Sequence, residues 1–133
     1  MSPRAYFADD SGELSLDGTW FFDYHRSDPN PNINPELAFE QPFVPETETI
    51  DVPSHWVLRG DGRWGAPAYT NVDFPFPVDP PFPPEENPVG DYSRRFTCPE
   101  SWLTSGGQVR LRFDGVESQM VVWVNSKWIG MAR

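Results

Sequence analysis

The chain is 133 residues long, the size of one domain, and its formal net charge of −10 disfavours nucleic acid, whose phosphates it would repel. Sixteen prolines and ten glycines make the chain rich in turns. Six Trp, four Tyr and ten Phe nevertheless supply too much apolar area for a disordered chain, so the composition predicts a folded protein with an aromatic core and long loops.

A single cysteine, Cys98, excludes a disulfide within the chain, and no histidine-containing motif beside it indicates a catalytic thiol. The first ten residues have no apolar run of the secretory type, and no stretch approaches the length of a membrane span. We therefore expect a cytoplasmic protein with neither a membrane nor nucleic acid among its partners.

The N-terminal residues 1–13 are polar and are expected to form an arm, followed by one domain over residues 14–133. The dipeptide Asp17-Gly18 indicates a turn or bulge. Trp20, Phe21 and Phe22 then form an apolar run without alternation, which is typical of a strand covered on both faces.

Residues 27–47 are interrupted by proline and asparagine, and we expect an ordered surface loop there. A short strand is predicted over Thr49–Val52, ended by Pro53 because proline donates no backbone hydrogen bond. The Arg59-Gly60-Asp61 motif resembles an adhesion signal, but three residues carry little information and we attribute the match to chance.

Two tryptophans, Trp56 and Trp64, flank this glycine-rich loop. They could form a stacking platform for carbohydrate, or they could pack in the core and between domains. Neither has a cluster of amide and acid side chains around it in the sequence, and we therefore favour packing.

The stretch after this loop is dominated by proline, and we call residues 74–88 the proline arm. Its prolines are Pro75, Pro77, Pro80, Pro81, Pro83, Pro84 and Pro88. Neither a helix nor a central strand can run through that density, because each ring removes a backbone donor and fixes φ. The pattern predicts an extended, semi-rigid arm that positions a functional loop.

The chain beyond the arm is predicted to be mainly β. A strand is expected over Asp91–Thr97 and a short helical turn over Pro99–Leu103, with proline at its first position. Gln108–Asp114 alternates cleanly, which predicts a strand with Val109, Leu111 and Phe113 directed inward.

The last predicted elements form a hairpin. Gln119–Val124 is apolar on both faces, Asn125-Ser126 is a two-residue turn signal, and Lys127–Met131 returns. The pattern therefore predicts an all-β sandwich, and the hairpin is followed by no closing strands, so the sandwich is expected to be incomplete at the C-terminus. Unpaired strand edges would invite pairing with another copy, and self-association is expected.

A set of motifs in order along the chain resembles the N-terminal sugar-binding domain of glycoside hydrolase family 2, of the bacterial β-galactosidase type. The motifs are LSLDGTWFF, VPSHW, APAYTNVDFPFPVDPPFPPEENPVGDYSRRF, PESWL, VRLRFDGVESQMVVWVN and KWIG. The resemblance spans nearly everything from Leu14 to Gly130, and its most specific part is the proline arm with its flanks. It implies a jelly-roll β-sandwich of the galactose-binding-domain type, in agreement with the β pattern.

The family's enzymes are retaining glycosidases that use two glutamates, one as acid/base and one as nucleophile. The resemblance places both in a later (β/α)₈ barrel that this chain does not contain, so we expect no catalytic residue here. It implies magnesium and sodium only for the full-length enzyme, and no metal site is expected in this chain. The glutamates that match no catalytic position, and are expected to be solvated loop charges, are Glu36, Glu40, Glu46, Glu48, Glu85, Glu86 and Glu117.

One functional position carries over from the resemblance. In the similar β-galactosidases the Asn of the Tyr-Thr-Asn-Val loop contacts the bound galactosyl group, and here that residue is Asn71. Tyr69, Val72 and Asp73 are expected to shape the loop around it. The alternative is that Asn71 is a turn residue bonded to its own backbone.

We therefore expect a sugar-binding, scaffold-forming fragment of a β-galactosidase, inactive by itself, with the catalytic barrel as its partner. The isolated chain is expected to bind β-galactosides weakly or not at all. Two alternatives are a free-standing carbohydrate-binding module and a piece that serves only in interdomain or oligomer assembly.

Overall fold

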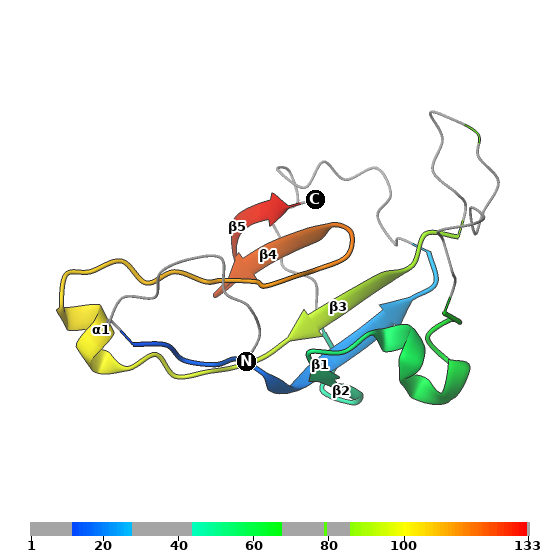
Figure 1. Cartoon of the computed structure of the whole chain (residues 1–133), viewed down its shortest axis with the longest axis horizontal. Coiled ribbons are helices and arrows are strands. Elements are labelled where there is room, and N and C mark those ends of the chain that lie inside the picture. Colours follow the sequence, from blue (N-terminus) through cyan, green and yellow to red (C-terminus); the bar gives the residue numbers. More distant parts are fainter. Residues whose placement is uncertain (1–11, 28–43, 68–78, 80–85, 133) are drawn as a thin grey trace.

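The chain folds into two small antiparallel sheets joined by long connections, as a computed structural model shows (Figure 1). The structure describes residues 12–27, 44–67, 79 and 86–132. Their elements are β1 (Gly18–His25), β2 (Thr49–Val52), the 3-10 turns η2 (Trp56–Leu58) and η3 (Gly60–Gly62), β3 (Val89–Ser93), α1 (Glu100–Thr104), β4 (Met120–Val124) and β5 (Lys127–Ala132).

The first sheet has the strand order β2-β1-β3, so β1 lies at its centre. Thr19 is paired with Asp51 on one side of β1, and Phe22 is paired with Tyr92 on the other. Because side chains alternate along a strand, Phe22, Tyr24, Gly90 and Tyr92 share one face of the sheet. The predicted strand at Thr49–Val52 is confirmed, and Pro53 follows it through a cis peptide bond.

The core lies on this face of the sheet and is aromatic. Phe22, Ile50 and Trp64 are buried, with exposed fractions of 1, 4 and 5 %. The ring of Trp64 meets Phe22 edge-on, with 4.6 Å between the ring centroids. Since rings of this size remove large apolar areas from water, this cluster stabilises the sheet and the turns η2 and η3 that cover it.

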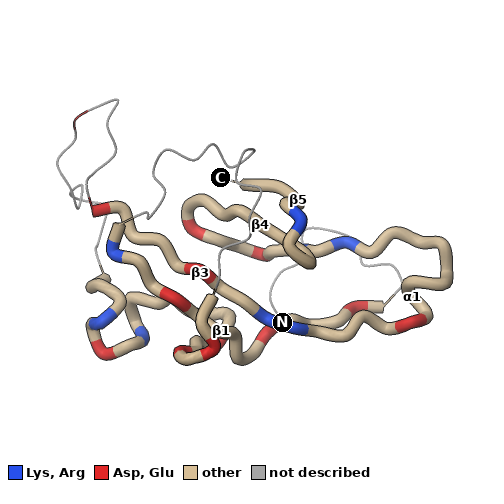
Figure 2. Tube along the Cα trace, turned by 180° about the vertical axis from the view of Figure 1, so that it is seen from behind, with Lys and Arg blue, Asp and Glu red and all other residues tan. Residues whose placement is uncertain are grey.

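The second sheet is a two-stranded hairpin of β4 and β5. Asn125 and Ser126 join the strands with φ of 51° and 62°, the pair of positive values that a tight hairpin turn requires. The pairing slips between Val122 and Trp123, where a bulge interrupts the register. The predicted hairpin is therefore confirmed, and it lies beside β3 on the side away from η2 and η3 (Figures 1 and 2).

Two predictions for the intervening segment need correction. β3 begins at Val89 and ends at Ser93, so the predicted strand over Asp91–Thr97 starts earlier and ends earlier than expected. The strand predicted over Gln108–Asp114 is wrong, because no ladder in the described part of the chain includes these residues. Their alternation is that of a strand, but a strand forms only where a neighbour accepts and donates its backbone hydrogen bonds.

The inward direction predicted for Val109, Leu111 and Phe113 is wrong for the same reason. Their exposed fractions are 53, 42 and 42 %.

The all-β expectation is confirmed, because strands make up most of the regular secondary structure among the described residues and the single α-helix there, α1, has five residues. No helix among these residues is long and apolar enough to cross a membrane.

Candidate functional site

The predicted loop residues Tyr69, Asn71, Val72 and Asp73 lie outside the described residues. The structure does describe what holds the chain before this loop, around Trp64, and at the end of the proline arm, at Glu86–Val89. We call these two attachment points, together with the end of β1 between them, the arm base.

The chain enters the arm base through a buried tryptophan. Trp64 lies against Phe22, and Arg63 stacks over its ring at 5.4 Å from the centroid. A Cβ built on Gly60 would be 2.7 Å from the same ring, so only glycine lets the backbone approach Trp64 this closely. Gly65 follows with φ of +86°, a conformation that favours glycine and turns the chain away from the core.

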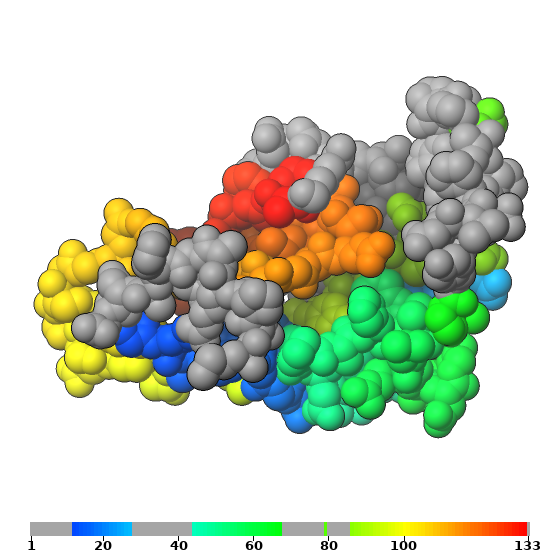
Figure 3. All heavy atoms as spheres, in the orientation of Figure 1, coloured from blue at the N-terminus to red at the C-terminus, as the bar shows by residue number. Residues whose placement is uncertain are grey.

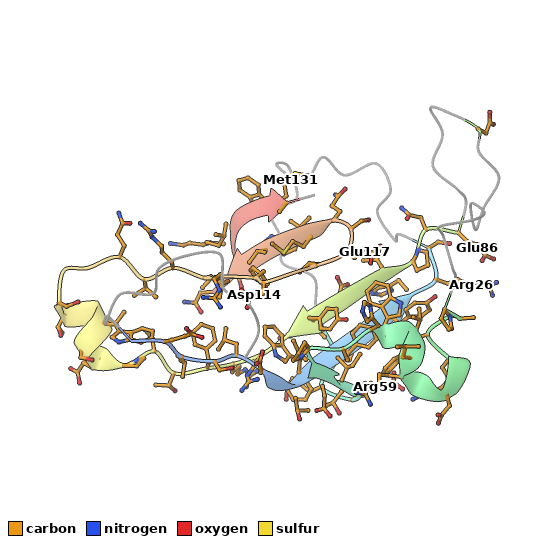
Figure 4. The ribbon with its side chains drawn as sticks, viewed as in Figure 1. Arg26, Arg59, Glu86, Asp114, Glu117 and Met131 are labelled. Carbon is orange, nitrogen blue, oxygen red and sulfur yellow. The ribbon has the colours of Figure 1, made fainter. Side chains whose placement is uncertain are left out.

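The chain leaves the arm beside the end of β1. Glu86 accepts a hydrogen bond from Arg26 at 2.7 Å, just beyond the end of β1, and the two side chains meet in Figure 4. Val89 then pairs with His25 as β3 begins. The chain is thus attached to the three-stranded sheet at Trp64, before the predicted loop, and at Glu86, near the end of the arm.

On the sheet face opposite the core, a histidine bridges two carboxylates. His25 Nε2 lies 3.1 Å from Asp91 Oδ2 and 3.6 Å from Asp23 Oδ2. Asp23 and Asp91 are direct cross-strand partners, and two like charges in that position repel. His25 offsets this repulsion by donating to a carboxylate, which helps to hold the end of β1 against the start of β3.

One titratable group on the core face, the phenol of Tyr92, has a shifted pKa. Burial raises the pKa of Tyr92 above its ordinary value, because the phenolate is poorly solvated beside the ring of Phe22. Among the residues described, no group of three or more His, Cys, Asp or Glu side chains is arranged to hold a metal ion.

Three of the glutamates expected to be solvated loop charges are held at the surface by arginines. Glu46 pairs with Arg95 at 2.9 Å, and Glu48 pairs with Arg63 at 2.5 Å. With Glu86 and Arg26 they form exposed ion pairs, as expected for solvated loop charges, and exposed pairs of this kind contribute little to stability.

An open hollow of about 250 Å³ lies beside β2 and was not anticipated from the sequence. Arg59 and Asp61, the two ends of the Arg-Gly-Asp motif, belong to its lining together with Thr49 and Trp64 (Arg59 is labelled in Figure 4). The packing expected for Trp64 is confirmed, because a ring that is 5 % exposed has no face left for stacking a sugar. Trp56 likewise packs against Phe22 and Tyr24.

Sequence reasoning did not single out Arg26 or His25. Arg26 and Glu86 are 60 residues apart, and His25 and Asp91 are 66 apart. No local pattern links such residues, and only the pairing of β1 with β3 brings them together.

Comparisons with known proteins place the sequence in a family. A family model described as glycosyl hydrolases family 2, sugar binding domain, matches residues 14–133. A protein of Arthrobacter sp. (strain B7) named beta-galactosidase is 45 % identical over 139 residues, covering 96 % of this chain. A beta-galactosidase of Pectobacterium atrosepticum is 43 % identical over 118 residues, covering 89 %. The chain spans 14 % and 11 % of the length of these two relatives.

Proposed function

Because this chain belongs to the sugar-binding domain family of glycosyl hydrolases family 2, we propose that it serves as the sugar-contacting scaffold of a longer β-galactosidase. In this proposal Asn71 completes the galactosyl subsite, and the chain catalyses nothing by itself. The observation that carries the proposal is the similarity to a beta-galactosidase over 96 % of the chain, a span that includes the proline arm.

The geometry of the arm base supports the part of the proposal that concerns positioning. The chain is attached to the first sheet by buried Trp64 before the predicted loop and by the Arg26–Glu86 pair near the end of the arm. Attachment of the flanking chain to the sheet restricts where the loop can lie, and this lowers the entropy lost when the loop contacts a ligand. The scaffold is therefore suited to presenting a loop to a neighbouring domain.

The chemistry of an asparagine suits the role assigned to Asn71. Its amide offers two donors and one acceptor, and together these can distinguish the orientations of neighbouring sugar hydroxyls. Tyr69, Val72 and Asp73 would set the loop conformation around the amide. The proline arm would lie against the catalytic barrel and hold the loop in place.

We assign catalysis to the rest of the longer enzyme. Retaining hydrolysis needs one carboxylate as nucleophile and a second carboxyl group whose pKa suits proton transfer. Each of Glu46, Glu48 and Glu86 is engaged by an arginine at the surface. We likewise assign the magnesium and sodium of the family's enzymes to that other part.

The proposal can be tested by grafting. The region of the Arthrobacter sp. beta-galactosidase that matches this chain would be replaced by residues 1–133, and hydrolysis of a chromogenic β-galactoside measured. We expect an active chimera in which Asn71→Ala lowers kcat/KM roughly tenfold to a hundredfold, the cost of losing a hydrogen bond to the substrate.

Gln119→Ala is the matched control, since Gln119 is an exposed amide residue outside the arm, just before β4. It should leave kcat/KM unchanged, and equal losses in the two variants would refute the role of Asn71. An inactive chimera that is correctly folded would refute the scaffold role.

Measurements on the isolated chain distinguish the proposed scaffold role from that of a free-standing carbohydrate-binding module. Calorimetric titration with galactose or lactose should show millimolar binding or none, whereas micromolar binding would favour the module. Cleavage of a chromogenic galactoside by the purified chain would contradict the assignment of catalysis to another domain.

A further inference from the structure

The buried ring of Trp64 fixes one point of the chain shortly before the predicted loop. The ring meets Phe22 edge-on, with 4.6 Å between the centroids, and Arg63 lies over it at 5.4 Å. The segment with the turns η2 and η3, which leads to Trp64, forms one continuous patch of the surface (green, lower right in Figure 3). Trp64 therefore anchors the chain seven residues before Asn71.

Gly65 is the last described residue before the predicted loop that lies against the core. A Cβ built on Gly65 would be 3.4 Å from the hydroxyl oxygen of Tyr24 in β1 and 3.9 Å from Cγ1 of Val57 in η2. Gly65 is half-buried, whereas Ala66 and Pro67 are exposed. The chain therefore turns away from the core at Gly65.

The direction of this turn depends on the backbone conformation of Gly65. Its φ is +86°, a value that residues with a side chain rarely adopt. The distances to Tyr24 and Val57 are ordinary van der Waals contacts, so a methyl group would fit at this position without moving either side chain. Glycine is therefore needed here for its positive φ and not for space.

The two residues after Gly65 carry its direction onward. The ring of Pro67 fixes its own φ and restricts Ala66 to extended conformations. A segment with so few allowed conformations passes a change of direction on to the residues beyond it. Asn71 follows Gly65 by six residues, at most about 22 Å of extended chain. Gly65 is thus placed to determine where the side chain of Asn71 is presented.

We propose that Gly65 is a positioning residue for the sugar contact, and that its positive φ directs the chain from the Trp64 anchor to the place where Asn71 meets the substrate. This role rests on the proposed function, in which Asn71 contacts the galactosyl group. Gly65 itself touches no substrate and acts only through Asn71. Alanine at this position favours a negative φ, which would send the chain in another direction.

The test uses the chimera of the Arthrobacter sp. beta-galactosidase, with kcat/KM for a chromogenic β-galactoside as the readout. Gly65→Ala should lower kcat/KM roughly tenfold to a hundredfold, because a contact displaced by a small distance is largely lost. Circular dichroism would establish that each chimera is folded.

Gly62→Ala is the matched control. Gly62 also has a positive φ, +83°, and a Cβ there would meet nothing within 4 Å. The two alanines strain the backbone alike, so urea denaturation of the 133-residue variants should show similar losses of stability. Gly62 precedes the Trp64 anchor, however, and the anchor stops a change of direction from reaching the loop. Gly62→Ala should therefore leave kcat/KM unchanged.

A double-mutant cycle distinguishes positioning from general damage to the fold. If Gly65 acts through Asn71, Gly65→Ala should cause no further loss in a chimera that already carries Asn71→Ala. General damage would instead multiply the loss caused by Asn71→Ala.

Gly65→Asn is a second variant that separates backbone conformation from size. Asparagine is larger than alanine but adopts a positive φ more readily, so Gly65→Asn should retain more activity than Gly65→Ala. The reverse order would contradict a role based on φ.

Equal kcat/KM values for Gly65→Ala and Gly62→Ala would overturn the positioning role and leave that of Asn71 intact. Losses that multiply in the double variant would overturn it in the same way. An Asn71→Ala chimera of unchanged activity would refute the proposed function, and the role of Gly65 with it.

Discussion

Gly90 lies directly against the indole ring of Trp56. A Cβ built on Gly90 would be 2.7 Å from Cζ3 of that ring and 2.8 Å from Cε2 of Phe22. Gly90 is also the cross-strand partner of Tyr24, so it opens a space in β3 that lets Trp56 from η2 pack onto the sheet. The first residues after the proline arm are thereby joined to the aromatic core.

Gly90→Ala should lower the free energy of unfolding by about 1–3 kcal/mol, because the added methyl group displaces two rings that have little room to move. Urea denaturation followed by tryptophan fluorescence would measure the change. Gly130→Ala is the control, since a Cβ at Gly130 in β5 meets nothing within 4 Å and should change stability by less than about 0.5 kcal/mol. Equal effects at the two positions would contradict this packing.

Phe22→Ala should cost about 3–5 kcal/mol, because Phe22 is 1 % exposed and its ring contacts those of Trp56, Trp64 and Tyr92. A domain of this size can be left unfolded by such a loss, so near-ultraviolet circular dichroism is the first measurement. Phe96→Ala removes a ring that is 48 % exposed and should cost less than about 1 kcal/mol. A folded Phe22→Ala chain of unchanged stability would show that the core lies elsewhere.

Two neighbouring arginines should differ in their contribution to stability. Arg94 donates to the carbonyls of Leu16 and Asp17 at 2.7 and 2.8 Å, which holds the residues before β1 against the chain after β3. Arg94→Ala should therefore cost about 1–3 kcal/mol. Arg95 forms a surface pair with Glu46, its side chain is 90 % exposed, and Arg95→Ala should cost about 0–1 kcal/mol. Urea denaturation of both variants would test the order, and a reversed order would refute it.

Stability should fall in alkaline solution through Tyr92. Burial raises the pKa of the folded phenol above its ordinary value of 10.0, so above that pH the unfolded chain loses the proton first. The unfolded state then binds fewer protons than the folded state, and the free energy of unfolding falls as pH rises between the two pKa values. Below the unfolded value this contribution is fully present.

The measurement is the free energy of unfolding at several pH values, from neutrality to the highest pH at which the chain is still folded. Tyr92→Phe should have a shallower slope than the parent chain in the alkaline range, because the other tyrosines remain and only this phenol is removed. Parallel slopes would show that Tyr92 does not titrate differently on folding.

The local sequence was sufficient to predict two kinds of element. One is a strand whose end is marked by a proline, and the other is a hairpin, whose turn and hydrogen-bonded residues are close together in the sequence. Thr49–Val52 was predicted with its observed bounds, since Pro53 cannot continue a strand. The β4–β5 hairpin followed from Asn125 and Ser126, residues that tolerate the positive φ that its turn needs. The motifs around the proline arm indicated the family, which the match over residues 14–133 confirmed.

The sequence could not predict whether Gln108–Asp114 is paired, because alternation describes the side chains and not the neighbour that a ladder needs. It could not predict the start of β3 either, where Val89 and Gly90 follow the last proline. Their membership of the strand comes from pairing with His25 and Tyr24, more than 60 positions earlier.

The sequence by itself determined the fold class and the family, because these depend on composition, periodicity and ordered motifs. The role of Asn71, which the family resemblance implies, stays a prediction. Only the tertiary structure decided how the proline arm is attached. Trp64 is buried under Phe22, Gly90 makes room for Trp56, and Arg26 meets Glu86 across 60 residues of chain. These contacts arise where β1, β3 and the turn η2 meet, and packing between distant segments leaves no periodic trace along the sequence.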